Sequence, residues 1–206
     1  MPMKVNEREY RDFTLNVKED DDGKKIVEGY ASVFNHPYTL WSYDDFELRE
    51  QVDPHAFDNA DMTDVIFQYN HEGRVFARVS NNTLAVLPDD TGLAISADLG
   101  GTEIGRGLYE EIKGGYTTKM SYGYVVNDEA YEDTREGEKL IRTRTVKGIS
   151  KVYDVSAVSI PANDATSISV RNLCDGEIEK VKAERLEALE LERKRLKTRI
   201  LLSKGD

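Results

Sequence analysis

The sequence predicts a mainly β protein (α+β) with one crossing helix and a charged helical tail. Short runs that alternate apolar and polar residues, separated by turn residues, recur between positions 11 and 163. The stretch 102–113 instead repeats apolar residues every four positions, and 175–203 is rich in Glu, Lys, Arg and Leu. We therefore expect a β domain at 1–171 and a helical tail at 172–206.

Turn residues divide the domain into strand-like segments. An Asp-Asp-Asp-Gly turn at 20–23 joins the first two, and a Glu72-Gly73 turn follows the third. Three other stretches are expected to lack regular strands: a long loop with a short final strand at 35–52, a turn and short helix from Pro54, and a polar loop at 127–139. The strand-like segments are 11–18, 24–34, 64–70, 74–79, 83–88, 92–99, 119–126, 140–147 and 149–160.

The two helical stretches have different patterns. In 102–113, Ile104, Leu108 and Ile112 share one face, and glycines at 114 and 115 end the helix. The tail has only a partial heptad stripe, which favours an isolated or weakly associating helix over a coiled-coil oligomerisation segment.

Composition narrows the class of protein. The 206 residues carry a formal net charge of −11, which argues against binding nucleic acid through phosphate contacts. No apolar run is long enough to span a membrane and no signal peptide begins the chain, so we expect a cytoplasmic protein. Cys174 is the only cysteine. We expect no metal site and no cofactor, because neither ligand spacing nor a phosphate-binding glycine loop is present.

Ser121 is the first candidate for a functional residue. Alternation in 119–126 places it on one strand face with Gly123, while Met120, Tyr122 and Tyr124 share the other face. A glycine two residues from a serine leaves space beside the hydroxyl, and glycines within strands often mark a close approach of a ligand. The local pattern alone favours an ordinary strand serine, because serines are common in strands.

A serine nucleophile needs a base and a group that orients the base. His36 and His55 lie in a loop and a turn and are expected to be exposed, whereas His71 ends an apolar strand. Asp154 is expected to share its strand face with aliphatic residues, where a carboxylate needs a partner. That partner is either a histidine or a cation such as Arg142 or Arg144, and the residues alone leave both possibilities open.

Six ordered motifs resemble those of the tailed-phage prohead (head maturation) proteases. The resemblance covers roughly residues 25–165, and each motif is weak alone. His55 replaces a usual glycine and Asp154 a usual glutamate. The motifs are Gly-Tyr-Ala-Ser-Val-Phe-Asn at 29–35, Pro-His-Ala-Phe at 54–57, Asn-His-Glu at 70–72, Gly-Leu at 92–93, Met-Ser-Tyr-Gly-Tyr at 120–124, and Asp-Val-Ser-Ala-Val-Ser-Ile-Pro-Ala-Asn at 154–163.

The resemblance implies a serine endopeptidase with the antiparallel β-barrel of the herpesvirus assemblins. Ser121 would be the nucleophile and His71 the general base; Asp154 as third member is inferred from its position. We further expect Gly123 and Tyr122 to contact substrate.

The same resemblance implies a place and partners. The chain would act within the phage procapsid in the host bacterial cytoplasm, cleaving scaffold or major capsid protein and itself, near the portal and as a homo-oligomer. The tail would be a docking, oligomerisation or removable segment. The alternative is a catalytically silent structural or scaffolding protein of the phage head with the same barrel.

Overall fold

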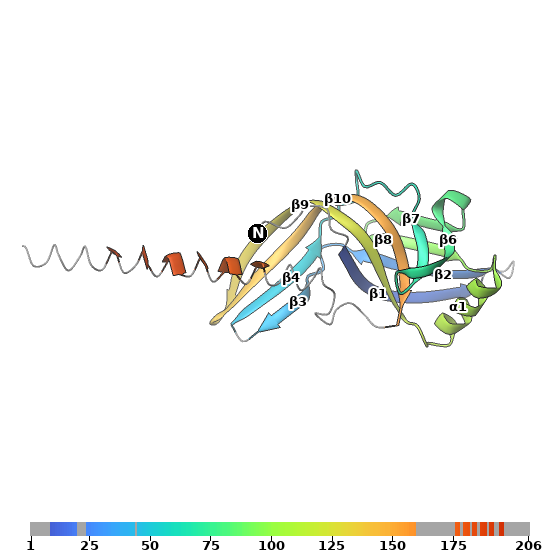
Figure 1. Ribbon diagram of the computed structural model, residues 1–206, viewed down its shortest axis with the longest axis horizontal. Helices are drawn as coiled ribbons and strands as arrows, with labels where there is room; N and C mark the ends of the chain where they lie inside the picture. The colour runs from blue at the N-terminus through green and yellow to red at the C-terminus, as the bar shows by residue number, and fades with distance from the viewer. Residues whose placement is uncertain are drawn as a thin grey trace, which may run out of the picture.

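The computed structural model describes residues 9–19, 24–43, 45–159 and, from the tail, scattered helical positions between 176 and 195. The described chain is mainly β, as predicted (Figure 1). Its strands are β1 (Glu9–Glu19), β2 (Lys25–Val33), β3 (Tyr38–Tyr43), β4 (Phe46–Val52), β5 (Ile66–Tyr69), β6 (Glu72–Arg78), β7 (Leu84–Pro88), β8 (Gly92–Asp98), β9 (Lys119–Glu136) and β10 (Lys139–Val158), with a short 3₁₀ turn η1 (Val79–Asn81) and the helix α1 (Glu103–Lys113).

Two long antiparallel strands, β9 and β10, extend through most of the β structure (Figure 1). The strands are hydrogen-bonded in the order β3-β4-β10-β9-β1-β2-β8-β7, and β5 pairs with both β10 and β6. We call the body the part formed by β1, β2, β5–β8 and α1 with residues 119–126 and 149–158. We call the arm the part formed by β3 and β4 with residues 129–136 and 139–146. The same two strands therefore connect the arm to the body.

Body and arm have separate hydrophobic cores. The body core includes Met120, Tyr122 and Tyr124, all fully buried, which confirms that these residues share one face of the strand. The arm core is small: it consists of Leu40, Phe46, Leu48, Leu140 and, from the tail, Val181.

A buried ion pair lies where the two cores meet. Arg144 Nη1 donates to Glu50 Oε2 at 2.7 Å, and neither side chain is exposed. The hydroxyl of Tyr124, a body-core residue, donates to the other oxygen of Glu50 at 3.3 Å. Because a buried charge that loses its partner is strongly destabilising, this network ties the arm to the body.

Helix α1 packs on the body through a face slightly rotated from the predicted one. Leu108, Tyr109 and Ile112 are buried, whereas Ile104 is 37% exposed. Gly105 takes the position facing the core: a Cβ there would lie 2.3 Å from the carbonyl oxygen of Leu99. Because Gly105 packs this closely against the backbone, the buried face of the helix includes Tyr109 and leaves Ile104 partly exposed. Four-residue periodicity cannot reveal this shift.

The structure corrects three expectations about local structure. Residues 35–52 form the hairpin β3–β4 instead of a long loop, and most of 127–139 continues β9 as far as Glu136. The residues after Pro54 form turns without a helix. The physical reason for the second error is cross-strand charge: Asp133 lies directly opposite Arg142, and opposite charges at paired positions stabilise strands whose own sequence is polar.

Within the described residues, the hydrogen-bonded strands form an open series that begins at β3 and ends at β7. In the same part of the chain, no helix has the length and apolar character needed to cross a membrane.

Candidate active site

Ser121 lies on β9, in the half that belongs to the body. Its partners across the sheet are Ser156 on β10 and Asp12 on β1. The residue is 1% exposed, and Ser121 Oγ accepts and donates no hydrogen bond among the described residues. Its neighbours Met120 and Tyr122 point into the core, so the pleat directs the serine to the opposite face of the sheet.

A β-bulge brings Asp154 to the face of Ser121. Val152 pairs with Tyr124, but Asp154 pairs with Gly123, so two residues of β10 oppose one residue of β9 at this point. Val152 is in the body core, and without the extra residue Asp154 would lie on that same face. The expectation that Asp154 shares its strand face with aliphatic residues was therefore wrong for the nearest of them, Val152, because alternation fails at a bulge.

His71 reaches the same face from the other edge of β10. Strand β5 runs parallel to β10, with Ile66 beside Asp154, and it ends in a two-residue turn formed by Asn70 and His71. Both turn residues have positive φ, 51° and 59°, the left-handed region that a tight two-residue hairpin uses. The chain thus reverses at 70–71, not at the predicted Glu72-Gly73, and His71 lies within the turn.

The imidazole and the carboxylate are in direct contact. His71 Nδ1 hydrogen-bonds to Asp154 Oδ1, and their side chains are 16% and 1% exposed. Ser156 Oγ donates to the same oxygen at 3.0 Å. A histidine whose Nδ1–H is held by a carboxylate has Nε2 as its proton acceptor when neutral, which is the form that a general base needs.

Two residues that were not among the candidate site residues hold this arrangement. Ser156, two positions from Asp154 on one face, fixes the carboxylate oxygen. Asn70 ties the histidine turn to the end of β10: its Oδ1 accepts from Ser159 N at 3.0 Å and its N–H donates to Ala157 O at 2.9 Å. Alternation along β10 could have indicated Ser156, because it lies two residues from Asp154. The pair Asn70-His71 could have indicated the turn, because Asn and His are enriched among residues with positive φ.

The two predicted substrate contacts have different surroundings. Gly123 is buried on the face of Ser121 and lies opposite Asp154. Tyr122 is fully buried on the other face, with its ring stacked 4.5 Å from that of Tyr124 and 6.3 Å from that of Phe57. The structure thus gives the Tyr122 ring a place in the body core.

The remaining candidate groups lie elsewhere. His36 is exposed, and His55, with a side chain 83% exposed, is within 3.1 Å of Asp58. Arg142 and Arg144, the cationic alternatives for Asp154, are in the arm and bind other carboxylates. Among the described residues, no group of three or more His, Cys, Asp or Glu side chains is arranged to hold a metal ion.

The structure therefore brings the three candidate residues, which come from neighbouring strands, to one face of the sheet. Ser121 comes from β9, Asp154 from β10 and His71 from the turn after β5, and β10 lies between the other two. Residues 13–183 match the family of caudovirus prohead serine proteases. The chain belongs to this family. No curated protein matches it, and no solved structure does either.

Membership confirms the resemblance seen in the motifs and gives the class of activity. Caudovirus prohead serine proteases act inside the procapsid on capsid or scaffold proteins, so the family implies serine-protease activity for this chain. The matched range includes β5, β9 and β10, which supply Ser121, His71 and Asp154, and it extends into the helical tail as far as residue 183.

Proposed function

We propose that this prohead protease is a serine endopeptidase in which Ser121 is the nucleophile, His71 the general base, and Asp154 the residue that orients the base. The observation that carries the proposal is the bond between His71 Nδ1 and Asp154 on the sheet face that also bears Ser121. A hydroxyl, an imidazole and a buried carboxylate on one face are the three groups that acyl transfer requires.

The reaction follows from these roles. His71 Nε2 takes the proton of Ser121 as Oγ attacks the carbonyl carbon of the scissile peptide bond. The carbon–nitrogen bond then breaks, and the protonated imidazole gives its proton to the departing amine. Water, deprotonated by the same imidazole, attacks the acyl ester, and the proton returns to Ser121 Oγ as the ester bond breaks. Asp154 stabilises the transient imidazolium in both halves of the cycle.

The site in this conformation is closed. Ser121 and Asp154 are each only 1% exposed, so a peptide carbonyl has no access to Oγ. We propose that substrate binding requires a movement that uncovers this face, and that Gly123 then lets the substrate backbone approach the serine. Such a requirement would keep the protease inactive until its substrates are assembled around it.

The proposed substrates and location are those that the family implies. The proposed substrates are the scaffold or major capsid protein and the chain itself, cleaved within the procapsid near the portal in the host cytoplasm, with the protease self-associated. We also propose that the body corresponds to the assemblin-like barrel, and that the domain ends near residue 171, where the tail begins.

Processing of head proteins tests the proposal. The chain is co-expressed with the capsid and scaffold proteins of its own phage, and cleavage is followed by mass spectrometry. Ser121→Ala is expected to fold normally and to abolish cleavage of the head proteins and of the protease. Processing by this variant at the normal rate would eliminate Ser121 as the nucleophile.

Ser32→Ala is the matched control. Ser32 is also fully buried, and its hydroxyl likewise has no hydrogen-bond partner among the described residues, but it lies on β2 in a different part of the sheet. Normal processing by this control would show that the loss in Ser121→Ala is chemical and not a general effect of deleting a buried hydroxyl. The alternative, a catalytically silent head protein, predicts no processing by any of the three chains.

A further inference from the structure

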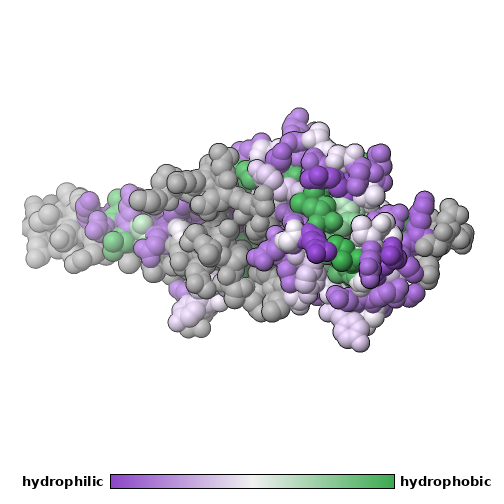
Figure 2. Space-filling model, turned by 45° about the vertical axis from the view of Figure 1, so that its right-hand side comes forward, coloured by the Kyte–Doolittle hydropathy of each residue, from purple (hydrophilic) through white to green (hydrophobic). Residues whose placement is uncertain are grey.

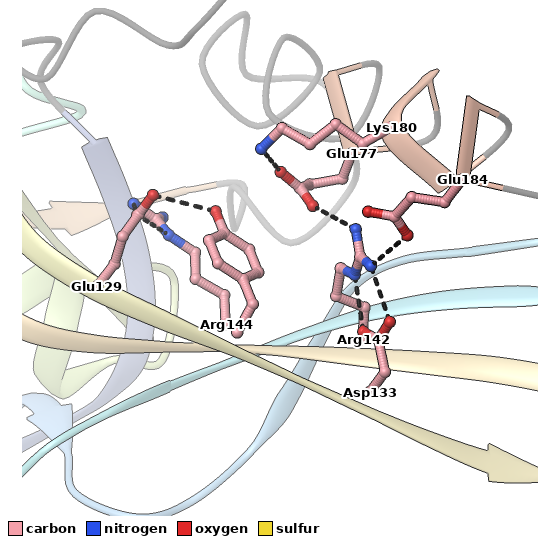
Figure 3. Close-up of polar contacts among 8 residues, drawn as sticks. Glu129, Asp133, Arg142, Arg144, Glu177, Lys180 and Glu184 are labelled. Carbon is pink, nitrogen blue, oxygen red and sulfur yellow. Dashed lines mark hydrogen bonds and ion pairs between the residues drawn. The ribbon is translucent and has the colours of Figure 1, made fainter. Parts of the chain in front are cut away.

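The arm carries a second, unrelated cluster of charged side chains on the face that meets the tail (Figure 3). At its centre is Arg142 on β10, 7% exposed. Its Nε and Nη2 donate to the two oxygens of Asp133 on the neighbouring strand, each at 2.7 Å. This fork-shaped pair holds the guanidinium in place and keeps the pKa of Asp133 below its usual value. The arginine is thus positioned by the arm itself.

The outer edge of the same guanidinium binds the tail. Arg142 Nη1 donates to Glu177 at 3.0 Å and Nη2 donates to Glu184 at 3.1 Å (Figure 3). Glu177 is only 3% exposed, although it belongs to a highly charged segment. Burial of a carboxylate is costly without a fixed cation, so Arg142 provides a specific site for this side chain.

Two further contacts come from the residues between the glutamates. Val181 is 5% exposed and completes the arm core. Lys180 Nζ lies 5.5 Å from the centre of the Tyr131 ring on β9, a cation–π contact, and also pairs with Glu177. Glu177, Val181 and Glu184 follow the spacing i, i+4, i+7, which places them on one side of a helix.

Beyond these turns the described tail residues project from the domain and are exposed (Figures 1 and 2). Leu186 is 62% and Leu191 is 51% exposed. A groove of about 430 Å³ remains beside the docked turns, lined by arm residues that include Leu140 and by Val181, Glu184 and Ala188 of the tail. The helix is therefore held at a few points beside an open groove, and it is not enclosed in a continuous core.

We propose that this face of the arm is a recognition site for a helix with glutamate, valine and glutamate at i, i+4 and i+7, and that it can exchange its occupant. Its occupant in the chain is the segment from Glu177 to Glu184. The same segment supplied on a separate molecule binds the same site once the resident copy is displaced.

The affinity expected for the same segment on a separate molecule follows from the length of chain that connects the resident segment to the domain. Sixteen residues separate Ser159 from Gly176, and a connection of that length gives an effective concentration on the order of 1 mM. Occupancy above about 90% in cis then needs a dissociation constant below roughly 100 µM for the separate segment.

The experiment uses the full chain and one substitution in the tail. Val181→Asp places a charge in the arm core and should release the resident helix; Leu186→Asp, at an exposed position of the same helix, is the matched control. Hydrogen–deuterium exchange of the amides at 176–188 is expected to rise at least tenfold in Val181→Asp and to stay unchanged in Leu186→Asp. Equal exchange in the two variants would contradict docking through Val181.

A fluorescent peptide with the sequence of 175–195 then tests recognition in trans. We expect it to bind the Val181→Asp chain at about 100 µM or tighter, and the wild-type chain at least tenfold more weakly, because the wild-type site is filled. The same peptide with Val181→Asp should not bind. Equal binding to both chains would place the site elsewhere, and no binding to the Val181→Asp chain at 1 mM would overturn the proposal.

Discussion

Replacing Asp154 by asparagine tests the proposed catalytic geometry most directly. Asparagine keeps the size of the side chain but removes its charge. If its amide group faces His71, the imidazole must carry its proton on Nε2 and can no longer accept the proton of Ser121. If its carbonyl faces His71, the tautomer is preserved, but the imidazolium that forms during the reaction loses its counter-charge.

The size of the effect can be worked from the contact. Unit charges about 4 Å apart near a protein surface attract by about 4 kcal/mol, which corresponds to roughly a thousandfold in rate. Since the pair is mostly buried and the wrong tautomer adds to the loss, we expect processing to slow by about 10³- to 10⁴-fold. Thermal unfolding should show a folded protein, because Ser156 Oγ can donate to the asparagine carbonyl or, in the other orientation, accept from its amide group.

The assay is a time course of head-protein cleavage with two comparisons. Asp154→Glu keeps a carboxylate and should process faster than Asp154→Asn. Asp61→Asn removes a carboxylate that binds Lys151 at 2.8 Å, with side chains 43% and 42% exposed, and should process normally. If Asp154→Asn processed head proteins within tenfold of the wild-type rate, the role given to Asp154 would be wrong.

Three further substitutions probe the surroundings. Ser156→Ala removes the second bond to the Asp154 oxygen and should slow processing about tenfold, with partial recovery in Ser156→Thr; an unchanged rate would exclude a positioning role. Gly123→Ala adds a methyl group beside Asp154 on the proposed substrate face and should slow processing without unfolding the protein, whereas a normal rate would argue against substrate approach there. Hydrogen bonds from Lys139, and to a lesser extent from Arg49 and Thr39, lower the pKa of Glu47 from 4.5 to about 2, so these contacts together contribute at most about 3 kcal/mol above pH 4.5, which is lost as the pH falls toward 2. Urea unfolding should therefore show Glu47→Gln less stable than wild type at pH 7 by an amount that shrinks by pH 3, and a constant difference would refute the linkage.

Periodicity located the strands of the body because those strands have one face in a core. In the stretch 119–126 alternation correctly grouped Met120, Tyr122 and Tyr124, which bury their side chains in one shared core, but Ser121 on the opposite face is buried as well. The distal half of β9, which lies in the arm, was missed because its partner strand stabilises it. Much of the distal half of β9 is polar, and its pairing depends on residues such as Arg142 that are distant in the sequence until the chain folds.

The sequence by itself determined the family and proposed the three residues of the site, through ordered motifs around His71, Ser121 and Asp154. Only the tertiary structure decided how two of them meet. A single extra residue in β10 moves Asp154 to the face of Ser121, and a turn with two positive φ angles carries His71 onto that carboxylate. Both features depend on pairing between strands, which no residue's own neighbours along the chain can specify.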